Sequence, residues 1–414
     1  MAEKPKITEA PGLVWRPRRN GWAAYWVAQA TMVERGYEPR LVNLWTGSDL
    51  TDVDVAMIRQ RCTHLQGEMI VWGAGLAPPP KFDGTLRALI NCYQTDADST
   101  YRLLRYHVRV RHDQMLRRIY AAHGDTRLED IKTRLIYAWH RQWTQDGKRI
   151  AIGHFFVAEL RTLFRFGMTL LEDKECTRLA AVMAELRFES PKPRTERMTA
   201  GQAVAVRAAC HAREWPSLAL GQAFQFDLML RQKDVIGEWV PESEPGDVAY
   251  QYQGRKWARG LLWQEIDQNF VLRHVTSKRG KPLEVNLRLA PMVMEELAQL
   301  AGVEPAALTR DKLPDMGPVL ICEHTKRPWL TAEYRRKWRM MADKAGVPKA
   351  VKNMDSRAGG ISEATDAGAD LEMVRHAATH SNINMTQRYS RGSTEKIETV
   401  MELRAKHRNK PKTD

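Results

Sequence analysis

The chain has 414 residues, of which 43% are hydrophobic and 28% charged, and this predicts a globular protein of about two to four domains. Its 64 lysines and arginines outnumber the 50 acidic residues, and the net charge of +14 favours a nucleic acid partner over a basic protein without one. The N-terminal sequence MAEKPKITEAPG has no apolar signal core, and no run approaches about 18 apolar residues. We therefore expect neither a secreted nor a membrane-spanning protein.

Cysteine usage excludes two further classes. The five cysteines are scattered and odd in number, and none forms a CxxC pair or a Cys/His ligand spacing. Neither a zinc site nor a disulfide framework is predicted, which fits the reducing cytoplasm. The cysteines are Cys62, Cys92, Cys176, Cys210 and Cys322.

The first 74 residues predict a small module of strands and one helix. Short aromatic and β-branched runs in residues 13–45 are separated by the turn sequences RRNG and ERGYEP, which favours two or three strands. Capping residues then open a helical pattern that continues to residue 72. Three arginines lie in the first turn region, where they either contact DNA phosphate or only face solvent. They are Arg16, Arg18 and Arg19.

Residues 82–188 predict a helical domain, separated from the first module by the linker GLAPPPKFDG. The most informative stretch, residues 99–124, places apolar residues at helical spacing, and these would form a buried stripe. The stripe is Leu104, Val108, Met115 and Leu116. Another face carries arginines, which suits a DNA backbone, although an ordinary solvated face is the alternative. These candidate DNA-binding residues are Arg102, Arg105 and Arg109.

A second linker, ESPKPRTER, precedes residues 198–414, which mix helices with a β-hairpin. The hairpin is predicted by two β-rich runs around the glycine-containing turn SKRGKP. A charged helix around residues 395–406 and a basic end close the chain. The predicted fold is mainly α with small β elements, an α+β class.

Groups suited to phosphate chemistry cluster in this last region. The chain has no GxxxxGK[ST], GxGxxG, HExxH or GxSxG motif. Instead arginine, lysine, histidine and tyrosine occur in a fixed order, although each alone also fits a structural role. The arginines could pair with nearby aspartates, and the histidine and tyrosine could pack. The ordered set is Arg231, Lys278, Arg357, His380 and Tyr389.

This order resembles the tyrosine recombinases of the phage-integrase type. In that family the motifs are T-G-L-R-x-G-E-L-L-x-L, L-R-W-x-D-I-D, a hairpin lysine, H-x-L-R and L-G-H-x-x-I-x-T-T-x-x-Y. The corresponding stretches here are LRQKDVIGEW, LLWQEID, TSKRGK, MDSR and THSNINMTQRY. The helical stretch GDTRLEDIKTRLIYAWHRQW resembles the core-binding domain of the family, and the N-terminal module loosely resembles its arm-binding domains.

The resemblance implies DNA cleavage and rejoining through a 3′-phosphotyrosine on Tyr389, flanked by the DNA-contacting Arg388. Arg231 and Arg357 would hold the phosphate, His380 would assist, and Lys278 would protonate the leaving 5′-hydroxyl. It implies no cofactor and no metal, since the phosphotyrosine stores the bond energy. It also implies three domains, at residues 1–74, 82–188 and 198–414.

The implied partners are double-stranded DNA and three further copies of the chain, in a homotetramer on DNA. A directionality factor or a DNA-bending protein would be an additional partner, and the setting would be the cytoplasm of a bacterium, with the gene on a mobile element or prophage. Two alternatives stay open. One is a catalytically weakened, recombinase-like DNA-binding protein, and the other is a DNA-relaxing enzyme of the type IB topoisomerase kind.

The sequence departs from the family pattern in two places. Met354 stands where His or Lys usually begins H-x-L-R, which puts full catalytic strength in doubt. About twenty residues, ESEPGDVAYQYQGRKWARGL, separate two motifs that usually run together. An alternative register would align GQAFQF with the first motif and put Ala223 at the arginine, but it would leave LLWQEID without a counterpart.

Overall fold

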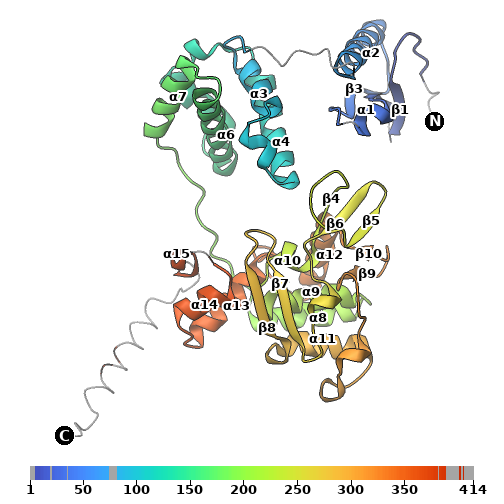
Figure 1. The fold of residues 1–414 in the computed structure, drawn as a ribbon, viewed down its shortest axis with the longest axis vertical. Coiled ribbons are helices and arrows are strands. Elements are labelled where there is room, and N and C mark those ends of the chain that lie inside the picture. The colour runs from blue at the N-terminus through green and yellow to red at the C-terminus, as the bar shows by residue number, and fades with distance from the viewer. Residues whose placement is uncertain are drawn as a thin grey trace. The chain divides into compact units, whose positions relative to one another are not determined.

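The computed structural model describes residues 5–18, 21–34, 36–73, 82–380 and 382–387, together with the single residues 401 and 404. It divides into two units, Met1–Pro191 and Lys192–Asp414 (Figure 1). The predicted α+β class is confirmed, because the structure combines many helices with small antiparallel sheets. Within the described residues, no helix combines the length and the apolar character that crossing a bilayer would need.

The N-terminal residues form the predicted strands and helix. Strands β1 (Leu13–Arg18), β2 (Gly21–Val27) and β3 (Leu41–Gly47) make an antiparallel sheet in the order β1-β2-β3. The short helix α1 (Ala30–Glu34) and the long helix α2 (Asp52–Gly73) complete the module. Trp26 from the sheet and Ile58 and Met69 from α2 are buried in a common core. Arg16 and Arg18 belong to β1 rather than to the turn after it.

Five helices form the predicted helical region of the first unit. They are α3 (Leu86–Thr95), α4 (Tyr106–His123), α5 (Thr133–Thr144), α6 (Ile150–Thr169) and α7 (Lys174–Glu185). Helix α6 packs against the other four, because its residues Phe156, Leu160 and Phe164 are apolar and completely buried. This core is separate from that of the N-terminal module.

The single helix expected over residues 99–124 is interrupted. The Ser99 hydroxyl accepts a hydrogen bond from the Tyr101 amide and starts a short 3₁₀ turn, Thr100–Leu103. Leu104 and Arg105 are then extended, and α4 begins only at Tyr106. Arg102 therefore does not share a helix with Arg109, so the predicted continuous arginine face is wrong at this point.

The apolar stripe expected on this helix is correct only in its second half. Met115 and Leu116 are buried, whereas Val108 is 41% exposed and Leu104 is half-buried. Because the helix is interrupted before α4, the residues that precede Tyr106 do not continue the buried face of α4. The spacing of the apolar residues alone did not indicate this.

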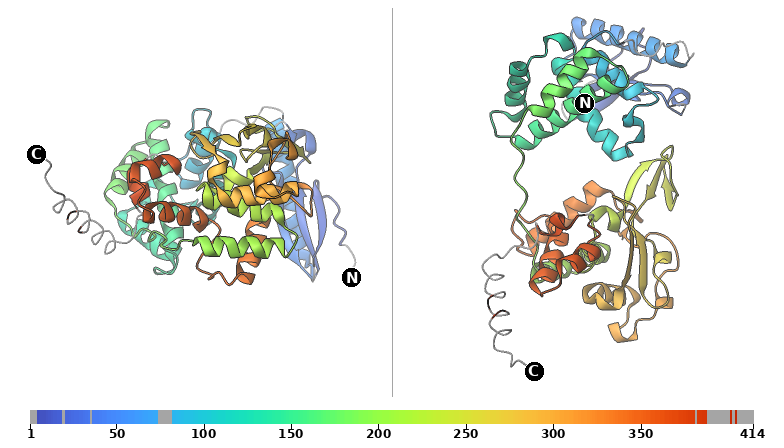
Figure 2. Two further views of the ribbon diagram at one scale, coloured as in Figure 1. Left: turned by 90° about the horizontal axis from the view of Figure 1, so that it is seen from below. Right: turned by 60° about the vertical axis from the view of Figure 1, so that its left-hand side comes forward.

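The second unit is built around the helix α9 (Pro216–Asp227), which is buried along almost its whole length. It packs against α8 (Ala200–His211), α11 (Pro291–Ala301) and α13 (Asp355–Asp366), while α12 (Thr331–Lys344) packs on α8. The strands lie along one side of these helices (Figure 2). The predicted hairpin is present as β7 (Val271–Val275) and β8 (Pro282–Asn286), and a smaller one is β9 (Ile321–Cys322) with β10 (Arg327–Pro328). Ala223, which the alternative register would align with the arginine, is completely buried within α9.

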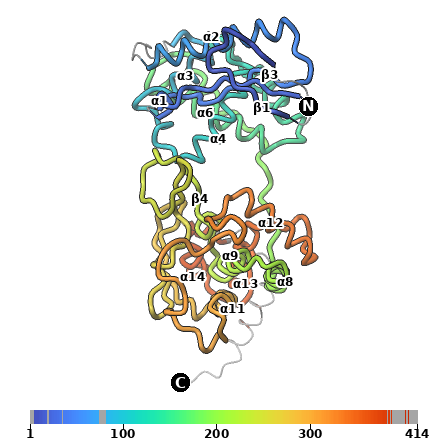
Figure 3. Tube along the Cα trace, turned by 90° about the vertical axis from the view of Figure 1, so that its right-hand side faces the viewer, coloured from blue at the N-terminus to red at the C-terminus, as the bar shows by residue number. Residues whose placement is uncertain are grey.

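The extra residues between the first two motifs form two strands, which pair with a strand that starts at the end of the first motif. These three strands are called the insertion sheet. Strands β4 (Glu238–Pro241), β5 (Tyr250–Tyr252) and β6 (Arg255–Ala258) pair in the order β4-β6-β5, at one edge of the unit (Figure 3). Gln253 and Gly254 both have positive φ, as a two-residue hairpin turn requires. Trp257 is buried and donates from Nε1 to the carbonyl of Ile236 at 2.8 Å. The insertion is thus anchored without displacing the motifs on either side.

Two consecutive glycines set the distance between α13 and its neighbours. A Cβ atom on Gly359 would lie 2.0 Å from the carbonyl oxygen of Met198, and one on Gly360 would lie 2.3 Å from that of Phe226. Both contacts are with backbone atoms, which cannot turn aside as a flexible side chain would. Only glycine permits this approach, and it brings Arg357, at the start of α13, to the end of α9.

Replacing Gly359 by alanine tests this packing. We expect Gly359→Ala to destabilise the protein by at least about 2 kcal/mol, since overpacking a close contact typically has an effect of this size. Thermal unfolding of the full chain, followed by circular dichroism, measures the change. Gly201→Ala in α8 is the matched control, because nothing lies within 4 Å of the added Cβ and alanine favours helix, so stability should rise slightly. Equal stability of the two variants would contradict the packing argument.

Candidate functional site

Arg231 lies in the connection between α9 and the short helix α10 (Gln232–Ile236), where it is the N-cap residue of α10. Its side chain is 23% exposed. One guanidinium nitrogen, Nη1, lies 3.4 Å from the hydroxyl of Thr379 and 3.7 Å from a carboxylate oxygen of Asp234. The guanidinium is therefore held from two sides while part of it stays accessible.

Asp234 joins Arg231 to the predicted hairpin. Its carboxylate is fully buried and accepts hydrogen bonds from the backbone N–H of Arg231 at 3.3 Å and from that of Ser277 at 2.7 Å. Ser277 directly precedes Lys278 in the β7–β8 turn. One buried charge thus fixes the base of this turn beside Arg231, which explains why an acidic residue stands three positions after the arginine.

The β7–β8 turn presents two lysines. Lys278 is exposed at its tip, whereas Lys281 is half-buried and donates from Nζ to the backbone carbonyl of His380 at 3.1 Å. Sequence reasoning chose Lys278 and overlooked Lys281. The signal was available in TSKRGK, because in a tight turn both ends lie close in space, so a lysine three positions later can reach the same neighbours.

Arg357 is the most buried cation of the site, with an exposure of 8%. Its guanidinium donates to the carbonyls of Met229, just before Arg231, and Ala378, just before His380. A planar guanidinium can serve two acceptors at once, which a lysine ammonium would do with less definite geometry. Arg357 therefore connects the segments that carry the other two candidates.

Three side-chain amides form a hydrogen-bond network next to the segments that carry Arg231 and Arg357. Asn353 accepts hydrogen bonds from Gln225 at 3.0 Å and from Gln232 at 2.9 Å, and donates to Gln225 at 3.0 Å. Gln232 follows Arg231 in the chain, and Asn353 precedes Arg357 by four residues. The network thus fixes the backbone of the two arginine-bearing segments relative to each other.

His380 follows α14 (Leu371–Ala377) and is 1% exposed. Its Nδ1 is 3.0 Å from the hydroxyl of Thr386 in α15 (Ile383–Gln387), which is also buried. Burial, helped by the nearby positive charges, lowers the pKa of this imidazole to about 4. His380 is consequently neutral at pH 7, so one ring nitrogen carries a proton and the other can accept one. The charges are those of Arg357, Arg231, Lys281 and Lys278.

The structure thus gathers Arg231, Arg357 and His380 at one place, with the two hairpin lysines within electrostatic reach of the imidazole. Tyr389, Arg388 and nearly all of the expected C-terminal helix lie outside the described residues. The last described residue before the tyrosine is Gln387, at the end of α15. Because Thr386 holds α15 to His380, the chain enters the undescribed segment close to the gathered cations.

Met354 is 62% exposed at the N-terminal end of α13. It precedes Arg357 by three residues, so the two share one face of the helix. Its neighbours are fixed, since Asp355 pairs with Arg194 at 2.6 Å and Asn353 belongs to the amide network. The backbone at Met354 is therefore well held, but its side chain is a thioether where the family motif has the charged or hydrogen-bonding group of His or Lys.

The arginines proposed for DNA contact in the helical region already have intramolecular contacts. Arg102 donates from Nη2 to the carbonyl of Thr95 at 2.8 Å, and Arg109 donates from Nη1 to that of Leu104 at 2.6 Å. Arg102 and Arg105 are exposed, and Arg109 is half-buried. Each guanidinium has five N–H groups, so one such bond does not exclude a contact with phosphate.

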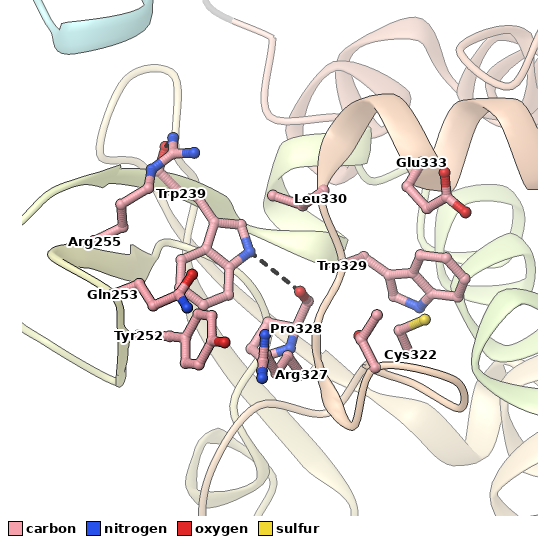
Figure 4. Close-up of a pocket in the computed structure, with 11 residues that line it drawn as sticks. Trp239, Tyr252, Gln253, Arg255, Cys322, Arg327, Pro328, Trp329, Leu330 and Glu333 are labelled. Carbon is pink, nitrogen blue, oxygen red and sulfur yellow. Dashed lines mark hydrogen bonds between the residues drawn. The ribbon is translucent and has the colours of Figure 1, made fainter. Parts of the chain in front are cut away.

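A cavity of about 300 Å³ lies apart from these residues, beside the insertion sheet (Figure 4). Trp239, Tyr252 and Trp329 contribute aromatic walls, and of the candidate catalytic residues that the structure describes, none lines the cavity. Trp239 donates from Nε1 to the carbonyl of Pro328 at 3.1 Å, which ties the insertion to the β9–β10 hairpin. Among the described residues, no group of three or more His, Cys, Asp or Glu side chains could hold a metal ion.

Comparison with solved structures defines the class of fold, which is that of the tyrosine recombinases. A fragment of lambda integrase, in a dimer bound to a COC′ core site, matches with a TM-score of 0.56 at 15% identity, over 74% of this chain and 95% of that chain. Lambda integrase in a tetramer bound to a Holliday junction matches with a TM-score of 0.55 at 14% identity, over 94% of this chain and 98% of that chain.

The integrase of the transposon Tn1549, in complex with circular intermediate DNA, is also similar, with a TM-score of 0.52 at 11% identity over 77% of this chain and 99% of that chain. Neither a family model nor a curated protein sequence matches the chain. At these identities the likeness establishes the fold. The tyrosine recombinase fold predicted from the ordered motifs is therefore confirmed.

The buried imidazole predicts a pH dependence of stability. The unfolded chain takes up a proton at His380 near pH 6.5, whereas the folded chain does so only near pH 4, so this contribution is complete above pH 6.5 and is lost as the pH falls towards 4. At pH 5 we expect a loss on the order of 2 kcal/mol relative to pH 7.5. Thermal unfolding at both pH values measures it.

His380→Gln is the reference for this experiment, because glutamine does not titrate and the other histidines stay unchanged. The variant should lose less stability between pH 7.5 and pH 5 than the original chain. An identical loss in both proteins would show that His380 is not buried in its neutral form.

Proposed function

We propose that the protein is a site-specific DNA recombinase that cleaves and rejoins DNA through a 3′-phosphotyrosine intermediate on Tyr389. The observation that carries this proposal is the convergence of Arg231 and Arg357, 126 residues apart in the sequence, on a buried neutral His380 beside the hairpin lysines. Such a cluster of cations around an uncharged imidazole suits a phosphodiester. The order of the motifs and the fold support the same reaction.

In the proposed reaction the guanidiniums of Arg231 and Arg357 bind the non-bridging phosphate oxygens and stabilise the charge that develops on five-coordinate phosphorus. The phenol of Tyr389 has a pKa of about 10 outside the protein, and the cations favour its loss of a proton. The phenolate oxygen forms a bond to phosphorus while the bond from phosphorus to the 5′-oxygen breaks. Lys278 supplies the proton to that oxygen, and the reverse steps rejoin a strand.

His380 would exchange a hydrogen bond with a non-bridging oxygen or take up the phenol proton. Its neutral state fits either role, because a neutral ring has both a donor and an acceptor nitrogen. The contact with Thr386 orients the ring, and Lys281 and Arg375, each 3.1 Å from the His380 carbonyl, hold its backbone.

The proposed substrate is double-stranded DNA, bound by a homotetramer during strand exchange. The similar lambda integrase structures contain a dimer bound to a core site and a tetramer bound to a Holliday junction. Residues 82–188 would bind core DNA, with Arg102, Arg105 and Arg109 as phosphate contacts, and residues 198–414 would carry the chemistry. Such a protein would act in the cytoplasm of a bacterium on a mobile element or prophage, with a directionality factor or DNA-bending protein as a further partner.

The N-terminal module would bind accessory arm sites. On the exposed face of its sheet, Arg16 and Arg18 lie over the ring of Tyr25, 5.1 Å and 5.7 Å from its centre, and Asn43 pairs with Tyr25 on the next strand. Arginines stacked on an aromatic ring are oriented rather than extended freely into solvent. This face therefore offers fixed donors to phosphates or base edges.

A covalent trap tests the proposed reaction. We expect the full chain to form a covalent adduct with a nicked duplex whose sequence has been selected for binding from a random pool, because the released fragment cannot religate. Tyr389→Phe should lower adduct formation at least about a thousandfold, since it removes the nucleophile, and leave DNA affinity within about twofold. Denaturing electrophoresis and a filter-binding assay measure the two quantities. Absence of an adduct with the original chain would refute the recombinase activity.

Met354 favours a second candidate, a recombinase-like protein that binds DNA but cleaves it weakly. If the missing donor limits the reaction, Met354→His should raise the cleavage rate at least about tenfold, because one donor to a developing charge commonly contributes that much or more. Met316→His, at a methionine that is 77% exposed in another loop, is the control. Equal rates for Met354→His and the original chain would show that the site works fully without this donor.

A further inference from the structure

The end of α14 has a residue of unexpected type. The backbone N–H of Thr379 donates to the carbonyl of His376 at 2.8 Å, and that of His380 donates to the carbonyl of Arg375 at 2.9 Å. This pair of bonds, in which Ala378 is the C-cap residue, is the Schellman arrangement that closes many helices. It requires a left-handed residue at the position of Thr379, and the φ of this residue is indeed +52°.

Threonine is a poor choice for that conformation. In the left-handed region the Cβ atom crowds the backbone, and a branched Cβ adds to the strain, so glycine or asparagine usually occupies the position. The tyrosine recombinase motif L-G-H has glycine at the corresponding place, whereas this chain has ATH. A strained residue that persists in a closely packed region indicates a compensating contact.

The side chain of Thr379 makes such a contact. It is 7% exposed, and its hydroxyl oxygen accepts a hydrogen bond from Nη1 of Arg231 at 3.4 Å. The same Nη1 lies 3.7 Å from the carboxylate of Asp234, which is fixed by the Ser277 amide. The guanidinium of Arg231 therefore lies between the Thr379 hydroxyl and the Asp234 carboxylate. A glycine at position 379 would remove the hydroxyl and leave the longer contact with Asp234.

We propose that Thr379 is a positioning residue, which holds the guanidinium of Arg231 in the orientation needed to bind a phosphate, at the expense of backbone strain. This inference rests on the proposed recombinase function. Its location supports it, because Thr379 directly precedes His380 and follows Ala378, whose carbonyl is bound by Arg357. One short segment thus contacts both arginines and carries the histidine.

Thr379→Gly and Thr379→Ser separate strain from contact. Glycine removes both, so the melting temperature of the full chain should rise by about 2–5 °C while the rate of covalent adduct formation falls about tenfold. Serine keeps the hydroxyl, so its cleavage rate should stay within about threefold of the original. DNA affinity should change by less than about twofold in both variants, because the contact orients a group for reaction and does not itself bind DNA.

Glu214→Gly is the control for relief of strain. Glu214 also has a left-handed φ, of +57°, but lies in the α8–α9 connection. This variant should raise the melting temperature without changing the cleavage rate. Cleavage by Thr379→Gly at the original rate would overturn the proposal, and so would a serine variant as slow as the glycine variant.

A double-mutant cycle keeps the inference testable if the original chain forms no adduct, which would refute the proposed function by itself. Melting temperatures are measured for Arg231→Ala, Thr379→Gly and the double variant. The effect of backbone strain is the same in both backgrounds and cancels, so a non-additivity of about 1 °C or more reports the contact. Additive shifts would overturn it.

Discussion

The guanidinium of Arg357 is the interaction on which the rest of the candidate site depends. It donates to carbonyls just before Arg231 and just before His380, so one buried side chain joins three distant segments of the chain. This position is reached only because Gly359 and Gly360 let α13 lie against backbone atoms of its neighbours. An arginine is suited to the task, since its planar group can bind two acceptors and keeps its charge when buried.

The remaining contacts distribute positive charge around a neutral centre. Asp234 and Thr379 hold Arg231, Lys281 reaches the carbonyl of His380, and the imidazole itself stays uncharged because it is buried among these cations. Most of the side chains that hold the site together form hydrogen bonds with backbone carbonyls or amides. The contacts described for Arg357 and Lys281 are with backbone carbonyls, whereas Arg231 lies beside the carboxylate of Asp234. Four cations around one uncharged imidazole make the site attractive to an anion.

The ordered motifs predicted the fold and identified Arg231, Arg357 and His380 as residues that the structure brings together. The spacing of the motifs indicates which residues meet, because Arg231, Arg357 and His380 each lie at or near the end of a helix. The interruption before α4 was not predictable, since it depends on a cap by Ser99 that competes with a continuing helical pattern. The strained Thr379 was missed because its role arises from a contact across 148 residues. Lys281 was overlooked although its place in the same tight turn as Lys278 indicated it.

The insertion sheet shows where this fold tolerates additional chain. Its strands lie between Ile236 and Leu261, and the buried Trp257 anchors them by donating from Nε1 to the carbonyl of Ile236. The contacts described for Arg231, with Thr379 and Asp234, involve no residue of β5 or β6. The Gln253–Gly254 turn is accordingly a suitable place to graft a fluorescent reporter or an affinity peptide.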